Sequence, residues 1–414
     1  MEEGKEALQS GKTAYTELPI DPGACSILIF TSGTSSLAKA VMLSQRNVLF
    51  DVHAMEQVED IKYPDVCMAF LPFHHAYGIG GQLIMLSVGA TTTFCDGLKY
   101  IQKNMVEYHV STFIGVPILI EAIWKKILNG IEKQGAMKKF RRGIKLSNFL
   151  LKLRIDRRRK LFSDIYDQLG GSIHAVFSGA SALDPECQQG FEDIGIHVCQ
   201  GYGMTEASPV ITTEDANDRK AGSIGKALPG IELAIADPNS EGIGELICRS
   251  PNVMLGYYNN PEETSKALAG GWLHTGDLAK ADKDGFVYIT GRAKNVIVLK
   301  NGKNVYPEEL ETLIEKLPYV KENIVIGEPR HNDGNWKDLA LVAKIVYDKE
   351  YFHTVQGITE TSEIEKYIRN DLDEINSGLP NYQRILRLRI QDTPMKKTTT
   401  GKVKRFEEGA RKSF

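Results

Sequence analysis

"IHAVFSGASAL" (residues 173–183) is a short apolar run that ends in small polar residues, and "GIHVCQGYGMTE" (residues 195–206) repeats the arrangement. Each stretch predicts a buried strand followed by a loop. Because such strands alternate with helical patterns through the first half of the chain, the sequence predicts a parallel sheet of the α/β class. Ligands bind to such sheets outside the carboxyl ends of the strands, so both loops are candidate binding loops.

The segments around these two stretches show three successive secondary-structure patterns. Up to about residue 223 the pattern is α/β; short strands with Gly and Asn turns then predict a β-rich subdomain over about 223–292. The last pattern predicts a small α+β module. The elements expected are a buried strand at 26–30, a helix at 44–58 capped by Ser44, strands at 66–73 and 89–96, a strand running into a helix over 110–128 with Pro117 near its start, short strands at 232–237, 244–250 and 285–291, a helix at 306–320, strands at 322–328 and 339–347, and a helix around 363–375.

The expected organisation is therefore a large domain over 1–292 and a small C-terminal domain over 293–414, with a hinge near 292–295. The amino-acid composition of the chain is ordinary for a soluble globular protein, with 42% hydrophobic and 25% charged residues. The formal net charge of −3 gives no overall attraction to nucleic acid. The six cysteines form no CxxC pair, the polar N-terminus lacks a signal peptide core, and no apolar run could span a bilayer, so a cytoplasmic location is expected.

The segment 138–160, "KKFRRGIKLSNFLLKLRIDRRRK", carries many basic and almost no acidic residues. Its apolar residues fall roughly at helical spacing. One interpretation is an amphipathic helix that touches an anionic membrane or a lipid substrate. In the membrane case the contact would be peripheral, at the inner face of the membrane. The other, which we favour, is a helix packed by its apolar face with the basic side in water.

Five separated stretches carry chemistry. "TSGTSSLAK" (31–39) could ring a phosphate with hydroxyls, N–H groups and a lysine, although it lacks the G-x-x-x-x-G-K-[ST] pattern and could be a solvated turn. In "LPFHHAYGIGG" (71–81) a histidine could line a cleft or be structural. In the loops at 178–183 and 200–206, small residues could admit a flat base, Tyr202 could stack on it, and Glu206 could bind Mg²⁺ or cap a surface turn.

The last two of these stretches lie towards the C-terminus. "GGWLHTGDLAK" (270–280) and the segment 291–311 contain Asp277 and Arg292, which could hold a ribose, unless "TGD" is only a turn. "KKTTTGKVKR" (396–405) places a lysine in a Gly/Thr-rich loop, which suits a phosphate or a developing negative charge but equally suits a solvated tail.

The order of these motifs resembles that of the acyl-adenylate-forming superfamily, which includes acyl-CoA synthetases, adenylation domains of peptide synthetases and luciferases. The resemblance covers nearly the whole chain from about Cys25 onward, and its spacing is most similar to bacterial long-chain fatty acyl-CoA synthetases. It implies that a fatty acid attacks the α-phosphate of ATP to give acyl-AMP and pyrophosphate, with Mg²⁺ as cofactor. The thiol of CoA then attacks the mixed anhydride.

The resemblance also implies roles for individual residues. The phosphates are held by Thr31, Ser32, Gly33, Thr34 and Lys39; Thr205 and Glu206 face the phosphates and Mg²⁺; Gly179, Ala180, Tyr202 and Gly203 belong to the adenine slot; Asp277 and Arg292 bind the ribose; Lys402 reaches the carboxylate and α-phosphate; His75, rather than His74, borders the acyl pocket; Lys294 sits at the hinge; and Gly302 lines the pantetheine channel.

Two departures from the family pattern matter. Ser36, Ala38 and Ala40 stand where glycine, proline and glycine are common in the phosphate loop. Family members also carry about 100–200 more residues before this loop, which predicts a fragment, a shortened member, an oligomer or a chain completed by a partner. The alternatives left open are transfer of the acyl group to a carrier-protein thiol and an ATP-binding but inactive truncated homologue.

Overall fold

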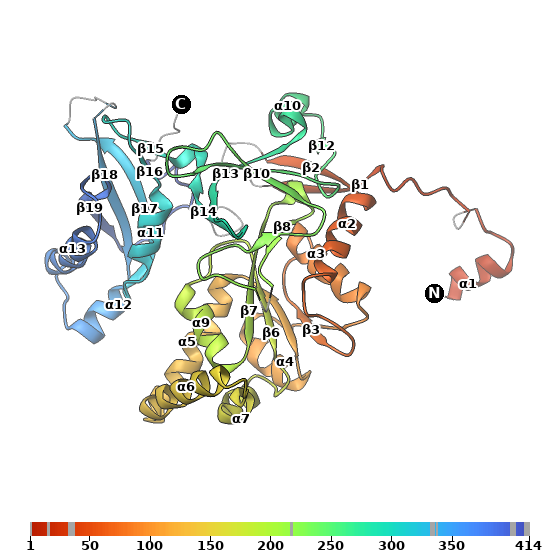
Figure 1. Cartoon of the computed structure of the whole chain (residues 1–414), viewed down its shortest axis with the longest axis horizontal. Helices are drawn as coiled ribbons and strands as arrows, with labels where there is room; N and C mark the ends of the chain where they lie inside the picture. Colours follow the sequence, from red (N-terminus) through yellow and green to blue (C-terminus); the bar gives the residue numbers. More distant parts are fainter. Residues whose placement is uncertain are drawn as a thin grey trace.

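The computed structural model describes residues 2–14, 17–31, 38–215, 218–331, 336, 338–397 and 403–409. A seven-stranded sheet lies at the centre of the larger part of the molecule (Figure 1), in the order β4-β3-β5-β6-β7-β8-β9. The pairings from β4 to β7 are parallel, as expected, and β8 and β9 extend the sheet in antiparallel fashion. The strands are β3 Val66–Ala69, β4 Thr91–Phe94, β5 Thr112–Gly115, β6 Ala175–Ser178, β7 His197–Gly203, β8 Val210–Thr213 and β9 Lys226–Ala227.

Helices cover both faces of this sheet, which is why its strands are apolar on both sides. Val176 on β6 packs in the cluster that contains residues of α4, α5, α8 and α9, whereas the next residue, Phe177, packs with α2 and α3. Ser44 caps α2 as predicted, in a reciprocal pair with Asn47. Pro117 begins α5, also as predicted. The helices are α2 Gln45–Glu56, α3 Ala76–Ser87, α4 Ile101–Glu107, α5 Pro117–Lys133, α8 Ser163–Gln168 and α9 Pro185–Ile194.

The prediction that residues 26–30 form a buried strand is only half right. Strand β1 (Cys25–Thr31) does form, but it belongs to a separate antiparallel sheet with β2 (Lys39–Ser44) and β12 (Gly256–Tyr257). Ile29 is buried, while Leu28 and Phe30 are 46% and 66% exposed. Successive side chains of a strand point to opposite faces, and only one face of β1 is covered by the described residues.

A four-stranded antiparallel sheet, β10-β11-β13-β14, forms the β-rich part. Its strands are β10 Glu232–Ala236, β11 Gly244–Arg249, β13 Leu273–Ala281 and β14 Val287–Arg292. The "TGD" motif lies inside β13, so the alternative of a simple turn is wrong. Gly276, in the left-handed region at φ 70°, permits the irregular backbone just before Asp277.

The C-terminal module packs α11 (Pro307–Glu315) and α13 (Thr361–Ser377) on a three-stranded sheet. Strands β17 (Val320–Pro329) and β18 (Leu339–Tyr347) and both helices match the expected elements. The third strand, β19 (Ile385–Gln391), was not predicted, although its sequence "ILRLRIQ" alternates apolar and polar residues. A short hairpin, β15 (Ile297–Val298) and β16 (Asn304–Val305), precedes α11.

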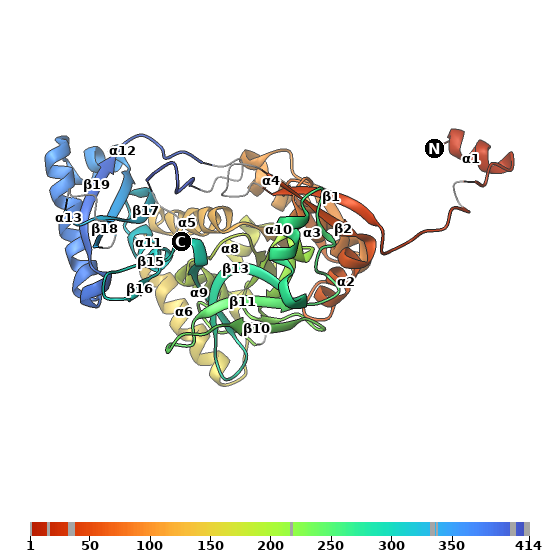
Figure 2. The ribbon, with the colours of Figure 1, turned by 90° about the horizontal axis from the view of Figure 1, so that it is seen from above.

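The remaining helices lie at the periphery. Helix α1 (Glu2–Gln9) buries none of its residues and stands apart from the body in two orthogonal views (Figures 1 and 2). Within the described part of the chain, no helix combines the length and hydropathy needed to cross a bilayer. The other helices are α6 Met137–Lys152, α7 Arg158–Leu161, α10 Pro261–Ala267 and α12 Lys349–Tyr351.

Candidate functional site

Three predicted residues form one hydrogen-bonded chain where β7, β13 and β14 meet. Tyr202 donates its hydroxyl to Asp277 Oδ2 at 2.6 Å, and Arg292 Nε lies 2.6 Å from Asp277 Oδ1. The register of β13 and β14 places Asp277 directly opposite Arg292. Asp277 is only 6% exposed, and the guanidinium balances its charge. Each carboxylate oxygen has a second lone pair, so Asp277 can still accept hydrogen bonds from vicinal hydroxyls.

The ring of Tyr202 is fixed by packing as well as by this hydrogen bond. It contacts the small cluster that includes Leu246, Ala279 and Val287. Burial, and then the neighbouring Asp277 carboxylate, raises the pKa of Tyr202 well above its usual value. The phenol is therefore a neutral donor at physiological pH, and its ring presents a fixed surface to a ligand.

A second chain of contacts joins Lys39, Tyr257 and Glu206. Lys39 Nζ lies 4.7 Å from the centroid of the Tyr257 ring, and the Tyr257 hydroxyl donates to Glu206 Oε1 at 2.8 Å. Glu206 is 7% exposed and lies in a 3₁₀ turn, Thr205–Ala207. The alternative of a surface carboxylate is therefore wrong. A buried carboxylate beside a lysine can share a cation with a phosphate that the lysine also contacts.

Lys39 has an acidic partner in this structure. Its ammonium pairs with Glu263 on α10, which also pairs with Lys266. The two lysines, Lys39 first, lower the pKa of Glu263 to about 2. Lys39 would have to leave Glu263, or share it, in order to contact a phosphate.

The phosphate loop itself is only partly described. Thr31 and Lys39 form the last paired position of β1 and β2, so the two ends of the loop lie side by side. Thr31 Oγ1 also donates to the carbonyl of Lys39 at 3.4 Å. Ser32, Gly33 and Thr34 lie outside the described residues.

Close backbone approaches explain two of the predicted glycines. A Cβ on Gly179 would lie 2.9 Å from the ring of Tyr77, and one on Gly203 would lie 1.8 Å from the carbonyl oxygen of Pro209. Ala180 adopts φ 77°, a left-handed backbone conformation that is unfavourable in free energy for any residue other than glycine. The loop after β6 is thus held tightly against its neighbours, as a slot for a flat ligand requires.

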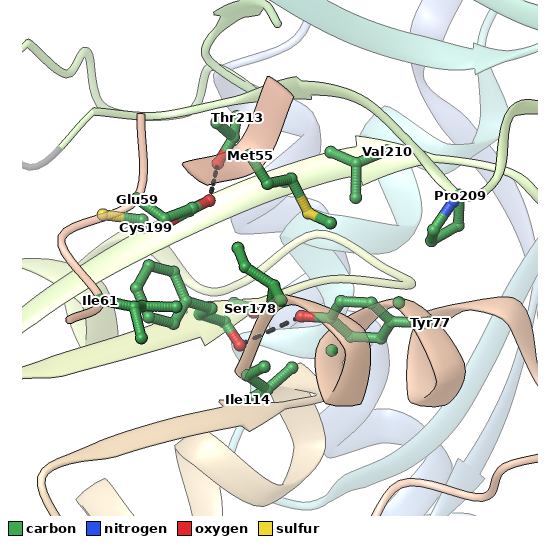
Figure 3. Close-up of a pocket in the computed structure, with 15 residues that line it drawn as sticks. Met55, Glu59, Ile61, Tyr77, Ile114, Ser178, Cys199, Pro209, Val210 and Thr213 are labelled. Atoms are coloured by element: carbon green, nitrogen blue, oxygen red, sulfur yellow. Dashed lines mark hydrogen bonds between the residues drawn. The ribbon is translucent and has the colours of Figure 1, made fainter. Parts of the chain in front are cut away.

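His75 lies at the N-cap position of α3, half-buried, with its ring 4.3 Å from that of His74. Burial, and then the charge of His74, lowers the pKa of His75. A neutral imidazole at this place suits the border of an apolar pocket. An apolar pocket of about 40 Å³ lies beside α3, between α2 and strands β6, β7 and β8 (Figure 3), but His75 is not among the residues that line it.

The C-terminal candidates lie on the small module. Lys294 is in the turn Ala293–Asn295 that directly follows β14, and Gly302 adopts φ 76° in the turn between β15 and β16. Lys402 lies outside the described residues. The chain on either side of it is anchored: Lys397 pairs with Glu322 at 2.6 Å, and Arg405 pairs with both oxygens of Glu311 at 2.6 and 2.7 Å.

A magnesium site would have to be shared with a ligand. Among the residues described, no group of three or more His, Cys, Asp or Glu is arranged to hold a metal ion. Mg²⁺ commonly binds through one or two carboxylates together with substrate phosphates. The buried carboxylate of Glu206, which is linked to Lys39 through the side chain of Tyr257, fits that donor set.

Two matches to family models cover most of the chain. Residues 1–258 match the model described as AMP-binding enzyme, and residues 294–409 match the AMP-binding enzyme C-terminal domain. The chain belongs to the AMP-binding enzyme family. The predicted resemblance to adenylate-forming enzymes is confirmed.

Curated relatives of this AMP-binding chain include fatty acid ligases. It is 31% identical over 335 residues to the long-chain-fatty-acid–CoA ligase ACSBG2 of Mus musculus, a match that covers 73% of this chain and 49% of the relative. It is 28% identical over 320 residues to the long-chain-fatty-acid–CoA ligase FadD15 of Mycobacterium bovis, covering 73% and 52%. The chain spans about half the length of the curated relatives it matches.

Solved structures of the same architecture include two bound to ATP. MatB from Rhodopseudomonas palustris, bound to ATP, superposes with a TM-score of 0.72 at 24% identity, covering 94% of this chain and 69% of that one. The O-succinylbenzoate CoA synthetase MenE of Bacillus subtilis, in complex with ATP and magnesium, gives a TM-score of 0.71 at 22% identity, covering 94% and 72%. These likenesses confirm the fold of this AMP-binding chain, with its large N-terminal and smaller C-terminal parts.

Several residues of the site were missed by the sequence reasoning. Tyr257 and Glu263 lie in "GYYNNPEETSK", which carries no recognisable chemical motif, and they join the site only through the β2–β12 pairing. Tyr77 lies within "LPFHHAYGIGG", a stretch in which the sequence indicates only the histidines as candidates. Its packing under Gly179 was not visible in the sequence.

Proposed function

We propose that this AMP-binding chain activates a medium- or long-chain fatty acid with ATP, releasing pyrophosphate, and then transfers the acyl group from acyl-AMP to CoA. The observation that carries the proposal is that two contact chains, Tyr202–Asp277–Arg292 and Lys39–Tyr257–Glu206, meet at the end of β7 and the turn that follows it. One chain offers a carboxylate for ribose hydroxyls, and the other offers a lysine and an acidic ligand for phosphates. Nothing in nucleotide activation requires more than such positioning and charge neutralisation.

Each residue has a physical task in this reaction. Asp277, held by Arg292, accepts hydrogen bonds from the ribose, and Lys39 neutralises phosphate charge. Mg²⁺, bound through Glu206 and the phosphates, supplies further neutralisation of the phosphate oxygens. Thr31, Ser32, Gly33, Thr34 and Thr205 supply hydroxyl and N–H donors, while Gly179, Ala180 and Gly203 admit the adenine.

The small C-terminal domain, over 293–414, is proposed to act in both steps. Lys402 contacts the carboxylate and α-phosphate during adenylation. The domain then swings about a hinge near 292–295 that includes Lys294, and Gly302 comes to line the channel for CoA. The hinge directly follows the last strand of the β-rich part, since β14 ends at Arg292. Transfer to a carrier-protein thiol instead of CoA is the alternative acceptor.

The acid is proposed from the pocket and from the relatives. The cavity beside α3 is lined largely by apolar side chains, including Met55, Ile84 and Ile114, and its volume of about 40 Å³ suits a short segment of an alkyl chain rather than a whole medium or long chain. The curated relatives above are long-chain ligases by name. His75 lies at the N-cap of α3, the helix that carries the lining residues Tyr77 and Ile84, and the proposal places it at the entrance to the acyl site.

The proposal also includes partners. Exposed apolar side chains on β1, Leu28 and Phe30, support covering by a second copy or by another chain, since large exposed apolar surfaces usually mark an interface. Leu146 and Phe149 on α6 and Leu153 at its C-cap are 48%, 58% and 56% exposed, in a segment rich in lysines and arginines. This supports peripheral contact with an anionic membrane at the cytoplasmic side.

The test of the main proposal is a panel of carboxylic acids supplied with ATP, Mg²⁺ and CoA. AMP release is expected to require the acid, and fatty acids of medium or long chain are expected to give the highest kcat/KM. ATP binding without AMP release for any acid would contradict the proposal and favour the inactive homologue. Transfer to a loaded carrier protein but not to CoA would favour the other acceptor.

A further inference from the structure

The pocket beside α3 has one polar end. Most of its wall is apolar, but Glu59, just after α2, reaches it from the side opposite Tyr77 (Figure 3). The Thr213 hydroxyl donates to Glu59 Oε1 at 2.9 Å. The other oxygen, Oε2, is buried and has no hydrogen-bond partner among the described residues. A buried polar atom without a partner in a cavity indicates that something else hydrogen-bonds to it.

The chemistry of this carboxyl follows from its surroundings. Burial, and then the nearby charge of Asp215, raises the pKa of Glu59 to about 8 although Thr213 opposes the shift. Tyr77 and Cys199 are the other titratable groups that line this pocket, and burial raises the pKa of both. At neutral pH the carboxyl is therefore protonated. Because Oε1 accepts the threonine hydroxyl, the proton belongs on Oε2, where it is free to donate.

An ordinary alkyl chain would leave this donor without a partner. A buried water needs two to four polar partners, and among the described side chains that line the pocket Ser178 Oγ is the one other oxygen without a hydrogen-bond partner. The Tyr77 hydroxyl already donates to the carbonyl of Phe177 at 3.2 Å, and the Thr213 hydroxyl is used by Glu59 itself. A polar group carried into the pocket by the substrate would satisfy Oε2 directly.

We infer that Glu59 is a specificity-determining residue that selects fatty acids bearing a hydrogen-bonding oxygen, a hydroxyl or a ketone, on the part of the chain far from the carboxylate. The inference rests on the proposed function, because it assigns the pocket to the acyl chain. The side of the pocket at Tyr77 adjoins Gly179 of the nucleotide slot. Glu59, opposite, therefore meets the distal part of the chain.

The first experiment uses the unaltered chain. Saturated acids and their monohydroxylated forms, with the hydroxyl moved stepwise along the chain, are compared by kcat/KM for AMP release and by Kd from calorimetry. One hydroxyl position is expected to raise kcat/KM and tighten Kd by about ten-fold or more over the parent acid, since sites built for a hydroxyl discriminate strongly against its loss. If every hydroxylated acid binds no better than its parent, the inference is wrong.

The two readouts separate this inference from the proposed function. Absence of AMP release with every acid would contradict the proposed function, while the Kd comparison would still decide the role of Glu59. AMP release with equal preference for parent and hydroxylated acids would leave the proposed function standing and overturn the inference.

Variants test whether Glu59 itself is responsible. Glu59→Leu is expected to lower the hydroxyl-to-parent ratio of kcat/KM by about ten-fold and to raise the hydroxyl-to-parent ratio of Kd by about the same factor. Glu59→Gln, whose amide can accept from Thr213 and donate from nitrogen, is expected to keep most of the ratio. Glu56→Gln, one helical turn earlier and outside the pocket lining, is the matched control and should leave the ratio unchanged. A ratio that Glu59→Leu does not alter would contradict the assignment, and if that variant does not fold, the panel on the unaltered chain decides.

Discussion

Asp277 joins two elements of the site, because it holds both Tyr202 and Arg292. Its position could be predicted from the "HTGD" motif, and so could that of Arg292. The hydrogen bond from Tyr202 could not, because it depends on how β7 crosses the separate sheet that contains β13. Motifs thus identify chemical residues, while their mutual contacts depend on packing that the motif does not encode.

Asp277→Asn is expected to weaken ATP binding. The amide cannot balance Arg292 and keeps only one oxygen acceptor, so the loss is about 2 kcal/mol, roughly thirty-fold in Kd. Calorimetric titration with ATP measures it. Asp284→Asn, an exposed acid paired with Lys220, is the control and should bind ATP like the unaltered chain; equal weakening in both variants would contradict the role of Asp277.

Asp51 makes a prediction about pH and stability. It is fully buried, receives hydrogen bonds from Asn252 Nδ2 at 3.0 Å and from the amide of Val210, and burial raises its pKa to about 8. Between its ordinary pKa of 3.8 and about 8, the folded state keeps a proton that the unfolded state has lost. Stability is therefore greatest at low pH in this window and falls as pH rises, by about 1.4 kcal/mol per pH unit.

Asp51→Asn tests this directly. The amide mimics the protonated acid, and its nitrogen can donate to Asn252 Oδ1, which has no partner among the described residues. The free energy of unfolding in urea, measured from pH 5.5 to 7.5, should fall less steeply in the variant, by about 1.4 kcal/mol per pH unit. Identical slopes in the two proteins would show that Asp51 is ionised in the folded state.

At the level of elements, α10 supplies the acidic partner of Lys39. Glu263 on this helix pairs with Lys39, while its neighbour Glu262 is largely exposed and pairs only with Lys266 among the described ion pairs. The two acids therefore provide a matched comparison of similar charge and location.

Glu263→Gln is expected to strengthen ATP binding by about three-fold, because a partly exposed ion pair worth about 0.2–1 kcal/mol no longer competes with phosphate. Glu262→Gln should change the Kd for ATP little. Both values come from calorimetric titration at fixed ionic strength. Weaker binding in Glu263→Gln would indicate instead that Glu263 holds Lys39 in the position from which it contacts phosphate.

Helix α6 agrees only in part with the interpretation of a helix packed by its apolar face, and the membrane interpretation stays a prediction. Phe140 and Ile144 pack against the core as a buried face would, yet Leu146, Phe149 and Leu153 face solvent. The sequence could not separate the packed apolar residues from the exposed ones, because a helix with apolar side chains on one broad face and a helix with them on two faces give similar spacings. The expected helix over 138–160 also ends earlier, at Lys152.

The exposed face of α6 predicts binding to vesicles. The chain is expected to sediment with phosphatidylglycerol vesicles, less so in high salt, and not with phosphatidylcholine vesicles. Phe149→Ser with Leu153→Ser should reduce the partition coefficient by about ten-fold or more. Leu86→Ser, an equally exposed leucine on α3, should not; equal binding by all variants would mean that α6 is not the contact.

At the scale of the whole molecule, the sequence predicted the α/β class, the β-rich part and most of the C-terminal module. It missed β19 and the separate sheet that contains β1, because strand patterns do not reveal which sheet a strand joins. Joint action of the large and small domains in the two half-reactions stays a prediction. It depends on Lys402, a residue that the sequence singles out and that lies beyond the described part of the chain.

The most direct test of the account is fatty-acid-dependent exchange of labelled pyrophosphate into ATP, measured without CoA. The account predicts exchange that requires a fatty acid and Mg²⁺ and that falls by about a hundred-fold or more in Lys402→Ala, because the lysine stabilises developing charge on the α-phosphate. The same variant should still form thioester from supplied acyl-AMP and CoA. Exchange that does not depend on a fatty acid, or equal loss of both half-reactions in Lys402→Ala, would contradict the account.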